Sequence, residues 1–283
     1  MAVGRFEIEQ LSEGFFELFE DGSFAKMDPK RLNNPMDDPS LGRYSSALGI
    51  DPLLIFDGET NIVIDPGLGW GLDKKSRYQD TSNVFTNLDI FGFRPQDIHF
   101  VILTHLHFDH MAGCSYVSEN IKTTASFPNA TYLVQKEEWE FALSQHGDRT
   151  PGAGYQLDEF YKLIAEDRVE FIDSDGYSPV KGIYLMKSGG HTPGHQVVKI
   201  EDNGETAYFL GDLIPTEYHL NHYAMKLIDH DSIRAKKAKT LLLRNAFKEN
   251  AQLFFYHSLF NKTGKLAKDK HKNYVLIDKI SSL

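Results

Sequence analysis

The chain has 283 residues, of which 41% are hydrophobic and 25% charged, and its formal net charge at pH 7 is −10. A chain of this size can bury a large core, and we expect one domain over residues 1–283. An acidic chain lacks the excess of Lys and Arg that neutralises phosphates, which argues against nucleic acid as a partner. No apolar run approaches the length of a membrane-spanning helix, so we expect no membrane partner.

The N-terminal residues and the cysteine content bear on the cellular compartment. Residues 1–25 intersperse Glu with Phe and Leu, whereas a secretory signal needs a basic start and an uninterrupted apolar stretch. The single cysteine, Cys114, cannot form an internal disulfide, which is typical of a reducing compartment. We therefore expect a cytoplasmic protein in which Cys114 is a small buried side chain.

The first part of the chain is predicted to start a sheet. The stretch 21–42 is polar, contains three prolines and is predicted to be a loop. Two strands are predicted over 46–56 and 61–64, and the four residues between them, Asp57-Gly58-Glu59-Thr60, form a hairpin signal. A short helix is predicted over 84–91.

The most informative stretch follows the apolar run 99–103, which is predicted to be a buried strand. It reads Thr104-His105-Leu106-His107-Phe108-Asp109-His110. Side chains alternate in an extended segment, so His105 and His107 project to one side, and Asp109 and His110 follow where the chain bends. Imidazole and carboxylate groups bind zinc at about 2.0–2.2 Å, so several must converge. This one loop could therefore supply ligands to two metal ions. The alternative is that these residues are surface histidines on a polar loop.

Three later junctions between a strand and a loop each end in a further donor. His191 lies in the glycine-rich turn 188–195, which is flexible enough to bring it against a preformed site. The apolar strand 207–210 ends at Asp212, and the apolar strand 253–256 ends at His257. This repetition is what a metal site at one edge of a sheet requires.

The remaining elements alternate along the chain. Strands are predicted at 132–134, 169–172 and 182–186, and helices at 135–143 and 158–164. Strands with helices between them predict helices packed outside a sheet. A basic-faced helix is predicted over 231–249; we interpret that face as solvated rather than as a nucleic-acid site, although with the tail 262–272 it could supply a basic groove.

Residues 218–230 carry more aromatic and imidazole groups than a connector needs. Two interpretations stay open for this segment. It could form a wall of a substrate pocket beside Asp212, with His219 as the best candidate. Alternatively, it could pack on the surface or form the face of a homodimer.

The order of these motifs resembles the metallo-β-lactamase superfamily. His105-x-His107-x-Asp109-His110, Gly-His-Thr-Pro-Gly-His at 190–195, Gly211-Asp212 and His257 occur in that superfamily's order. The resemblance implies an α/β fold, the αβ/βα four-layer sandwich with two mixed sheets and helices on the outer faces. The motifs look most like the branch that contains N-acyl homoserine lactonases. One departure is Pro215, which stands where a well-known lactonase group has a Tyr that contacts the substrate carbonyl.

The resemblance also implies roles for single residues. One metal ion would be held by His105, His107 and His191, and the other by Asp109, His110 and His257. Asp212 would bridge the two ions, and Asp109 and Asp212 would be the catalytic carboxylates. Asp65 resembles an early Asp that orients the metal loop, His195 would orient ligands from outside, and the loop 21–42 would overhang the site.

The sequence therefore predicts a metal-dependent hydrolase of a small-molecule substrate. A dinuclear metal-bound hydroxide would cleave an ester or lactone bond, an acyl homoserine lactone being one candidate. Two divalent ions are expected, with zinc as the first choice and manganese, iron or cobalt also suited to these donors. The alternatives are a phosphodiesterase or nuclease, a thioesterase of the same superfamily, and a non-catalytic metal-binding protein.

Overall fold

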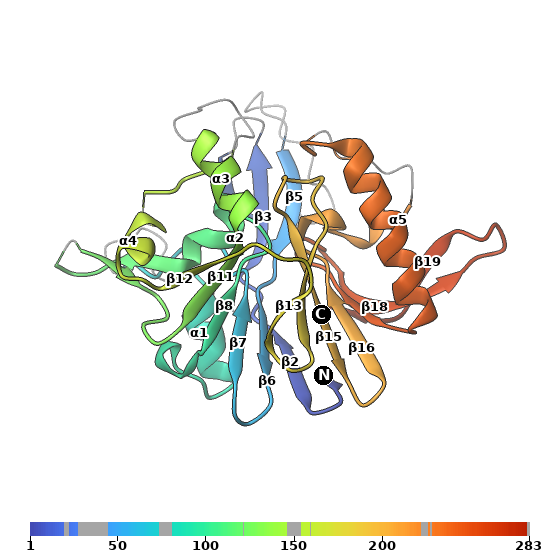
Figure 1. Cartoon of the computed structure of the whole chain (residues 1–283), viewed down its shortest axis with the longest axis horizontal. Coiled ribbons are helices and arrows are strands. Elements are labelled where there is room, and N and C mark those ends of the chain that lie inside the picture. The colour runs from blue at the N-terminus through green and yellow to red at the C-terminus, as the bar shows by residue number, and fades with distance from the viewer. Residues whose placement is uncertain are drawn as a thin grey trace.

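The computed structural model of the chain describes residues 1–19, 23–27, 45–73, 81–120, 122–145, 154–158, 160–221, 226 and 228–281. Two seven-stranded sheets face each other across the centre of the molecule, and helices lie on their outer sides (Figure 1).

The first sheet is mixed. In spatial order its strands are β1 (Ala2–Val3), β2 (Phe6–Gln10), β6 (Leu53–Phe56), β7 (Asn61–Ile64), β8 (Phe100–Ile102), β11 (Thr131–Gln135) and β12 (Val169–Ile172). Strands β7, β8, β11 and β12 run parallel, and the others are antiparallel to their neighbours. The parallel strands place their carboxyl ends at one edge, where the loop after β8 begins.

The second sheet is mostly antiparallel. In spatial order its strands are β13 (Tyr177–Val180), β14 (Ile183–Lys187), β15 (Gln196–Asp202), β16 (Glu205–Phe209), β17 (Gln252–Phe254), β18 (Asn261–Lys268) and β19 (Tyr274–Ser281). Only the pair β16 and β17 is parallel among these described strands. The carboxyl ends of β16 and β17 therefore lie side by side.

Alternating apolar residues build three layers of core. Ile55, Ile64 and Ile102 of the first sheet pack against residues of the second sheet, among them Val198 and Phe209. Their sequence neighbours on the same strands point the other way and pack beneath α1 (Val84–Ile90), α3 (Lys136–Ser144) and α4 (Phe160–Ala165). The second sheet packs its outer face against α5 (Ser232–Lys248). Helices therefore cover both sheets, and the predicted four-layer sandwich is confirmed.

Two helix starts show why these segments are helical. The Asn83 side chain accepts hydrogen bonds from the backbone of Phe85 and Thr86 and so caps α1. The Asp231 side chain caps α5 in the same way, through the backbone of Ile233 and Arg234. The short helices are α2 (Phe108–Met111) and the 3₁₀ helices η2 (Pro95–Asp97), η3 (Ala112–Cys114), η4 (Gly211–Leu213) and η5 (Glu217–Leu220).

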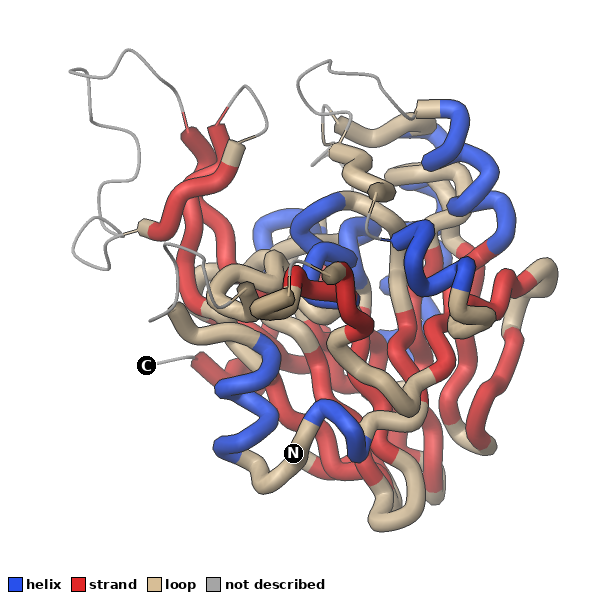
Figure 2. The backbone as a smooth tube through the Cα atoms, turned by 90° about the vertical axis from the view of Figure 1, so that its left-hand side faces the viewer, coloured by secondary structure: helices blue, strands red, loops and turns tan. Residues whose placement is uncertain are grey.

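Two small sheets complete the fold. Strands β4 (Phe24–Lys26), β3 (Gly14–Phe19) and β5 (Ser45–Ile50) form a three-stranded sheet that stands above one end of the sandwich (Figure 2). Strands β9 (Ser115–Val117) and β10 (Thr123–Ala125) form a hairpin after η3. The small sheet of β3, β4 and β5 rises at the same end of the molecule as α2 (Figure 1).

The predicted elements agree with the structure except near the N-terminus. The predicted strand 46–56 is two strands, because Asp51-Pro52 interrupts it and proline has no backbone N–H for a sheet ladder. The predicted loop 21–42 contains β4 at Phe24–Lys26, and its other residues, apart from Ser23 and Met27, lie outside the described residues. Cys114 is buried, as predicted. None of the described helices has both the length and the apolar character needed to cross a membrane.

Candidate metal centre

All seven candidate ligands come together at the end of the sandwich where four strands finish. His105 and His107 follow β8, and Asp109 and His110 lie in α2 directly after them. His191 lies in the turn between β14 and β15. Asp212 lies in η4 after β16, and His257 follows the neighbouring β17. Both sheets therefore contribute donors to one place.

The first group consists of His105, His107 and His191. Nε2 of His105 lies 2.9 Å from Nδ1 of His107, and the same Nδ1 lies 3.1 Å from Nε2 of His191. Three imidazole nitrogens that face one another so closely could hold one ion.

The second group consists of Asp109, His110 and His257. Oδ2 of Asp109 lies 3.4 Å from Nε2 of His257 and 3.8 Å from Nε2 of His110. The ligand atoms of all three residues lie within 4.8 Å of one another. This mixed set of two imidazoles and a carboxylate could hold a second ion.

Asp212 lies between the two groups. Its Oδ2 is 3.3 Å from Nε2 of His191 in the first group. Its Oδ1 is 3.2 Å from Nε2 of His257 and 3.5 Å from Nε2 of His110 in the second. One carboxylate oxygen thus faces each group, which is the placement that a bridging ligand needs.

Two polar atoms in this cluster test whether a cation fits it. Nε2 of His110 and Oδ1 of Asp212 are both buried, and although they lie 3.5 Å apart, neither makes a hydrogen bond of good geometry with a described residue. Leaving such atoms unpaired costs about 1–3 kcal/mol each, so native proteins usually provide them with a partner. A divalent ion within reach of both would be that partner, and the residues present fit it.

The pKa values point to the same charge requirement. Burial lowers the pKa of His107 to about 4 and holds the pKa values of His105 and His191 well below their usual range. These imidazoles are therefore neutral at pH 7, the form that binds a metal. Burial also lowers the pKa of His110, but Asp109 and Asp65 outweigh it and raise that pKa to about 10. A positive charge is thus favoured beside Asp109 and Asp65. A bound metal cation would supply that charge in place of the proton on His110.

Comparison with known proteins identifies the family. The sequence pattern of the metallo-beta-lactamase superfamily matches residues 47–248, which is more than half of the chain. The chain belongs to the metallo-β-lactamase superfamily. The matched segment contains six of the seven candidate ligands, and His257 lies beyond it.

Relatives of this metallo-β-lactamase-superfamily chain include lactonases. An N-acyl homoserine lactonase of a Bacillus species is 29% identical over 175 residues, which are 61% of this chain and 61% of that protein. A probable metal-dependent hydrolase from Staphylococcus aureus has a similar structure, with a TM-score of 0.74 and 24% identity over 99% of this chain and all of the other. AidC, described as a dizinc quorum-quenching lactonase in complex with a product N-hexanoyl-L-homoserine, covers 98% of this chain and 95% of its own, with a TM-score of 0.70 and 22% identity.

Most candidate histidines in this superfamily member have an outer partner for the second ring nitrogen. Nδ1 of His110 lies 2.8 Å from Asp65, Nδ1 of His257 lies 2.8 Å from the carbonyl oxygen of Gly49, and Nδ1 of His191 lies 3.1 Å from Asp229. Nδ1 of His105 lies 3.0 Å from the hydroxyl of Thr104. Such partners fix the ring orientation and leave Nε2 free to face the centre.

The predicted orienting residues lie next to the centre. Asp65 is fully buried and accepts hydrogen bonds from the backbone and the hydroxyl of Thr104 at 2.7 and 2.6 Å. Nε2 of His195 accepts a hydrogen bond of 3.0 Å from the backbone amide of Asp212. Both residues thus contact segments that carry candidate ligands, and their orienting role stays a prediction.

His219 lies in η5, and Nδ1 is 2.8 Å from the hydroxyl of Thr216. Burial is the largest effect on its pKa and, with Lys226 nearby, lowers it to about 4, while Asp212 acts in the opposite direction. His219 is thus close enough to the centre for Asp212 to influence it, and its role in a pocket stays a proposal. Four of its neighbours in the aromatic segment, residues 222–225, lie outside the described residues.

Sequence reasoning missed several residues around the centre. The ring of Tyr256 stacks on His110 at 4.1 Å between centroids, and its hydroxyl donates to the carbonyl oxygen of Asp109. Lys226 lies 3.0 Å from Asp229, the partner of His191. Glu138 in α3 contacts two of the ligand-bearing loops. Tyr256 precedes His257 directly, which was an available signal, whereas the other three are single polar residues in ordinary surroundings.

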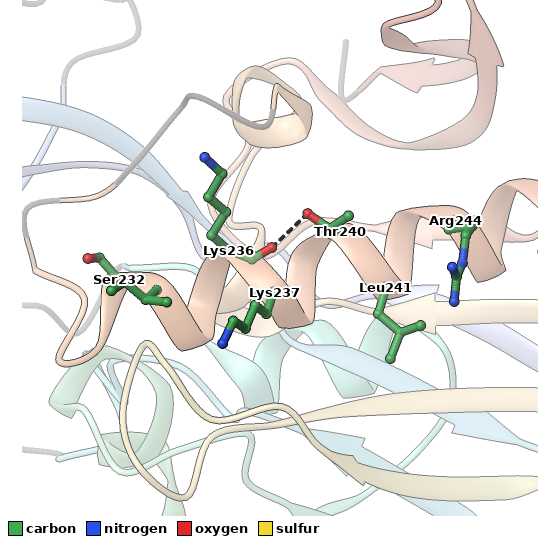
Figure 3. A pocket seen from close by; sticks show the side chains of 7 residues that line it. Ser232, Lys236, Lys237, Thr240, Leu241 and Arg244 are labelled. Atoms are coloured by element: carbon green, nitrogen blue, oxygen red, sulfur yellow. Dashed lines mark hydrogen bonds between the residues drawn. The ribbon is translucent and has the colours of Figure 1, made fainter.

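A groove runs along the exposed side of α5 (Figure 3). It has a volume of about 670 Å³, and its lining includes Lys236, Lys237, Leu241 and Arg244 but none of the candidate ligands. The tail 262–272 does not extend this basic face through Lys262, because that side chain is buried and paired with Asp51 at 2.5 Å. The groove on α5 is therefore separate from the candidate metal centre.

Proposed function

We propose that the protein is a metal-dependent hydrolase that cleaves an ester or lactone bond of a small molecule at a two-metal centre. His105, His107 and His191 would hold one ion, and Asp109, His110 and His257 the other. The observation that carries the proposal is the position of Asp212, whose two carboxylate oxygens face different groups at 3.2–3.5 Å.

The chemistry follows from the donor set. When bound, two divalent ions would polarise the attacked carbonyl and lower the pKa of a water molecule toward neutrality, so that it can attack. Asp212 would orient that water and accept its proton, as a general base within hydrogen-bond reach. No Gly-x-Ser-x-Gly motif of a serine nucleophile occurs in the sequence, so the residues present support attack by water.

A lactone is the preferred substrate class because the curated relatives are named as N-acyl homoserine lactonases. These relatives are matched over less than two thirds of their length, so the substrate is proposed rather than carried over. Pro215 cannot supply a phenol to a substrate carbonyl. We propose His219, in the helix that follows Pro215, as a polar group in the substrate pocket.

Zinc is the ion that we propose first. Imidazole and carboxylate donors suit zinc, and they also suit manganese, iron and cobalt, so availability decides among these ions. Cys114 plays no part in this set: its thiol is buried, and burial raises its pKa well above the usual range, so it stays protonated.

The test is turnover on a small substrate panel by protein of measured metal content. The panel holds a long-chain acyl homoserine lactone, a simple γ-lactone, a thioester and bis-p-nitrophenyl phosphate. We expect turnover of the lactones at least about 10²-fold above that of the phosphodiester, because the site must favour one reaction by differential transition-state binding. Turnover confined to the phosphodiester or the thioester would replace the lactone proposal with that activity.

A further inference from the structure

We propose that Glu138 is a positioning residue that holds the His105–His107 loop and the His191–His195 loop in register for metal binding. This inference rests on the proposed metal centre and names a residue outside the ligand set. Glu138 lies in the first turn of α3, on a different element from every candidate ligand, and its side chain is fully buried.

One side of the Glu138 carboxylate contacts the first loop. The backbone amide of Leu106 donates to Oε1 at 3.0 Å. Leu106 stands between His105 and His107, so this hydrogen bond fixes the peptide that joins two candidate ligands. A displacement of the carboxylate would therefore move both imidazoles.

The other side contacts the second loop. The hydroxyl of Thr192 donates to Oε2 at 2.5 Å. Thr192 directly follows His191 in the second loop. The two oxygens of one carboxylate thus connect the loops that carry three of the candidate ligands.

Gly194 shows how closely this loop approaches α3. A Cβ atom at Gly194 would lie 2.1 Å from the backbone nitrogen of Glu138 and 2.5 Å from its Cα. Only glycine fits at such a distance, so the loop can lie against the start of the helix. The backbone contact and the carboxylate together fix the second loop relative to α3.

A third donor connects Glu138 to the rim of the centre. The hydroxyl of Tyr155 donates to Oε1 at 3.1 Å, and the Tyr155 ring lies 5.0 Å from the ring of His107. Tyr155 therefore packs on a candidate ligand while its hydroxyl is held by Glu138.

Packing alone does not explain a carboxylate at this position. An apolar side chain would bury at this core-facing site without the desolvation penalty that a carboxylate carries. Three donors from three segments offset that penalty, and the N-terminal end of α3 favours a negative charge. The residue type fits a role that needs acceptors facing two loops at once.

The experiment compares Glu138→Gln with Glu140→Gln, measuring zinc affinity by competition with a chromophoric chelator and the visible absorption spectrum of the cobalt-substituted protein. Glu140 lies on the same helix, its side chain is 63% exposed, and its only described ion pair is with Lys136 at 4.0 Å. Gln accepts on one side only, so its amino group must face the donors of one loop. We expect zinc binding about 10–100-fold weaker in Glu138→Gln, with an altered cobalt spectrum. Glu140→Gln should match the wild type in both measurements.

Wild-type zinc affinity and an unchanged cobalt spectrum in Glu138→Gln would overturn the proposal. If Glu138 sets the relative position of the two loops, the loss of one acceptor oxygen must alter the metal site. If Glu138→Gln does not fold, Thr192→Val and Tyr155→Phe take its place, since each removes one donor and keeps the side-chain shape. Unchanged zinc affinity in both would overturn the proposal equally. These measurements need no substrate, so a wild-type protein that binds two ions without opening lactones would refute the proposed function alone.

Discussion

The Asp212→Asn variant is expected to lose about 10³-fold in turnover of its best lactone and to bind fewer than two metal ions per chain. Asp212 faces His191 with one oxygen and His110 and His257 with the other. An amide keeps the shape but replaces one oxygen by a donor, so only one of the two groups can still use the side chain as a ligand. The change therefore acts on metal binding and on proton acceptance together.

Asp173→Asn is the matched control, because the Asp173 side chain is 82% exposed and its ion pair with Lys136 spans 3.7 Å. It removes the same charge from the chain at a solvated site and should leave turnover and metal content unchanged. Turnover and metal content are measured on the same preparation of each variant. Full turnover in Asp212→Asn would contradict the bridging role, and so would two tightly bound ions.

The Asp65→Ala variant is expected to lose about 4 kcal/mol of unfolding free energy, with metal binding weakened as well. Asp65 accepts from the backbone of Thr104, from its hydroxyl and from Nδ1 of His110, and all of these groups are buried. Alanine would leave two or three donors without an acceptor, each at a cost of about 1–3 kcal/mol. Part of the loss falls on His110, whose orientation depends on this contact.

Asp167→Ala separates the hydrogen bonds from the backbone conformation. Asp65 and Asp167 both have a left-handed backbone, with φ of 47° and 55°, but Asp167 is exposed to solvent. Alanine in that conformation costs about 1 kcal/mol or slightly more at either position. Urea unfolding of both variants gives the difference, and an equal loss in the two would show that the contacts of Asp65 add nothing.

The candidate metal ligands could be predicted from the sequence because most of them directly follow an apolar strand. His105, His107, Asp109 and His110 follow one apolar strand, and Asp212 and His257 each follow another. These strand–loop junctions predicted a metal site at a sheet edge, and the order of the motifs in the superfamily implied which donors share an ion. The donors in fact come from two sheets. The structure brings all seven together, and the family match agrees with the fold that the motif order implied.

Glu138 and Asp229 could not be predicted in this way. Glu138 looks like one of several acidic residues at the start of a surface helix, and only the fold brings Leu106 and Thr192 to its carboxylate. Asp229 meets His191 because its backbone neighbours bond to the turn that carries this histidine. Such contacts join segments far apart in the sequence, and no local spacing encodes them.

The N-terminal strands were missed for a related reason. The alternation of Glu with Phe and Leu in the first 20 residues argues against a signal peptide, but alternation with period two is also the pattern of a half-buried strand. Pro52 is a local signal for the split at Asp51-Pro52, but the sequence does not show that the two halves join different sheets, β5 pairing with β3 and β6 with β2 and β7. Lys262 likewise becomes a buried partner of Asp51 through pairing distant in sequence.

The most direct test of the two-metal hydrolase is a zinc titration of metal-stripped protein, with lactone opening followed at each addition. We expect no turnover without metal, a rise with added zinc and a plateau at two zinc ions per chain. A plateau at one ion per chain would contradict the bridged centre at Asp212. Full turnover by the metal-stripped protein would contradict metal-dependent hydrolysis altogether.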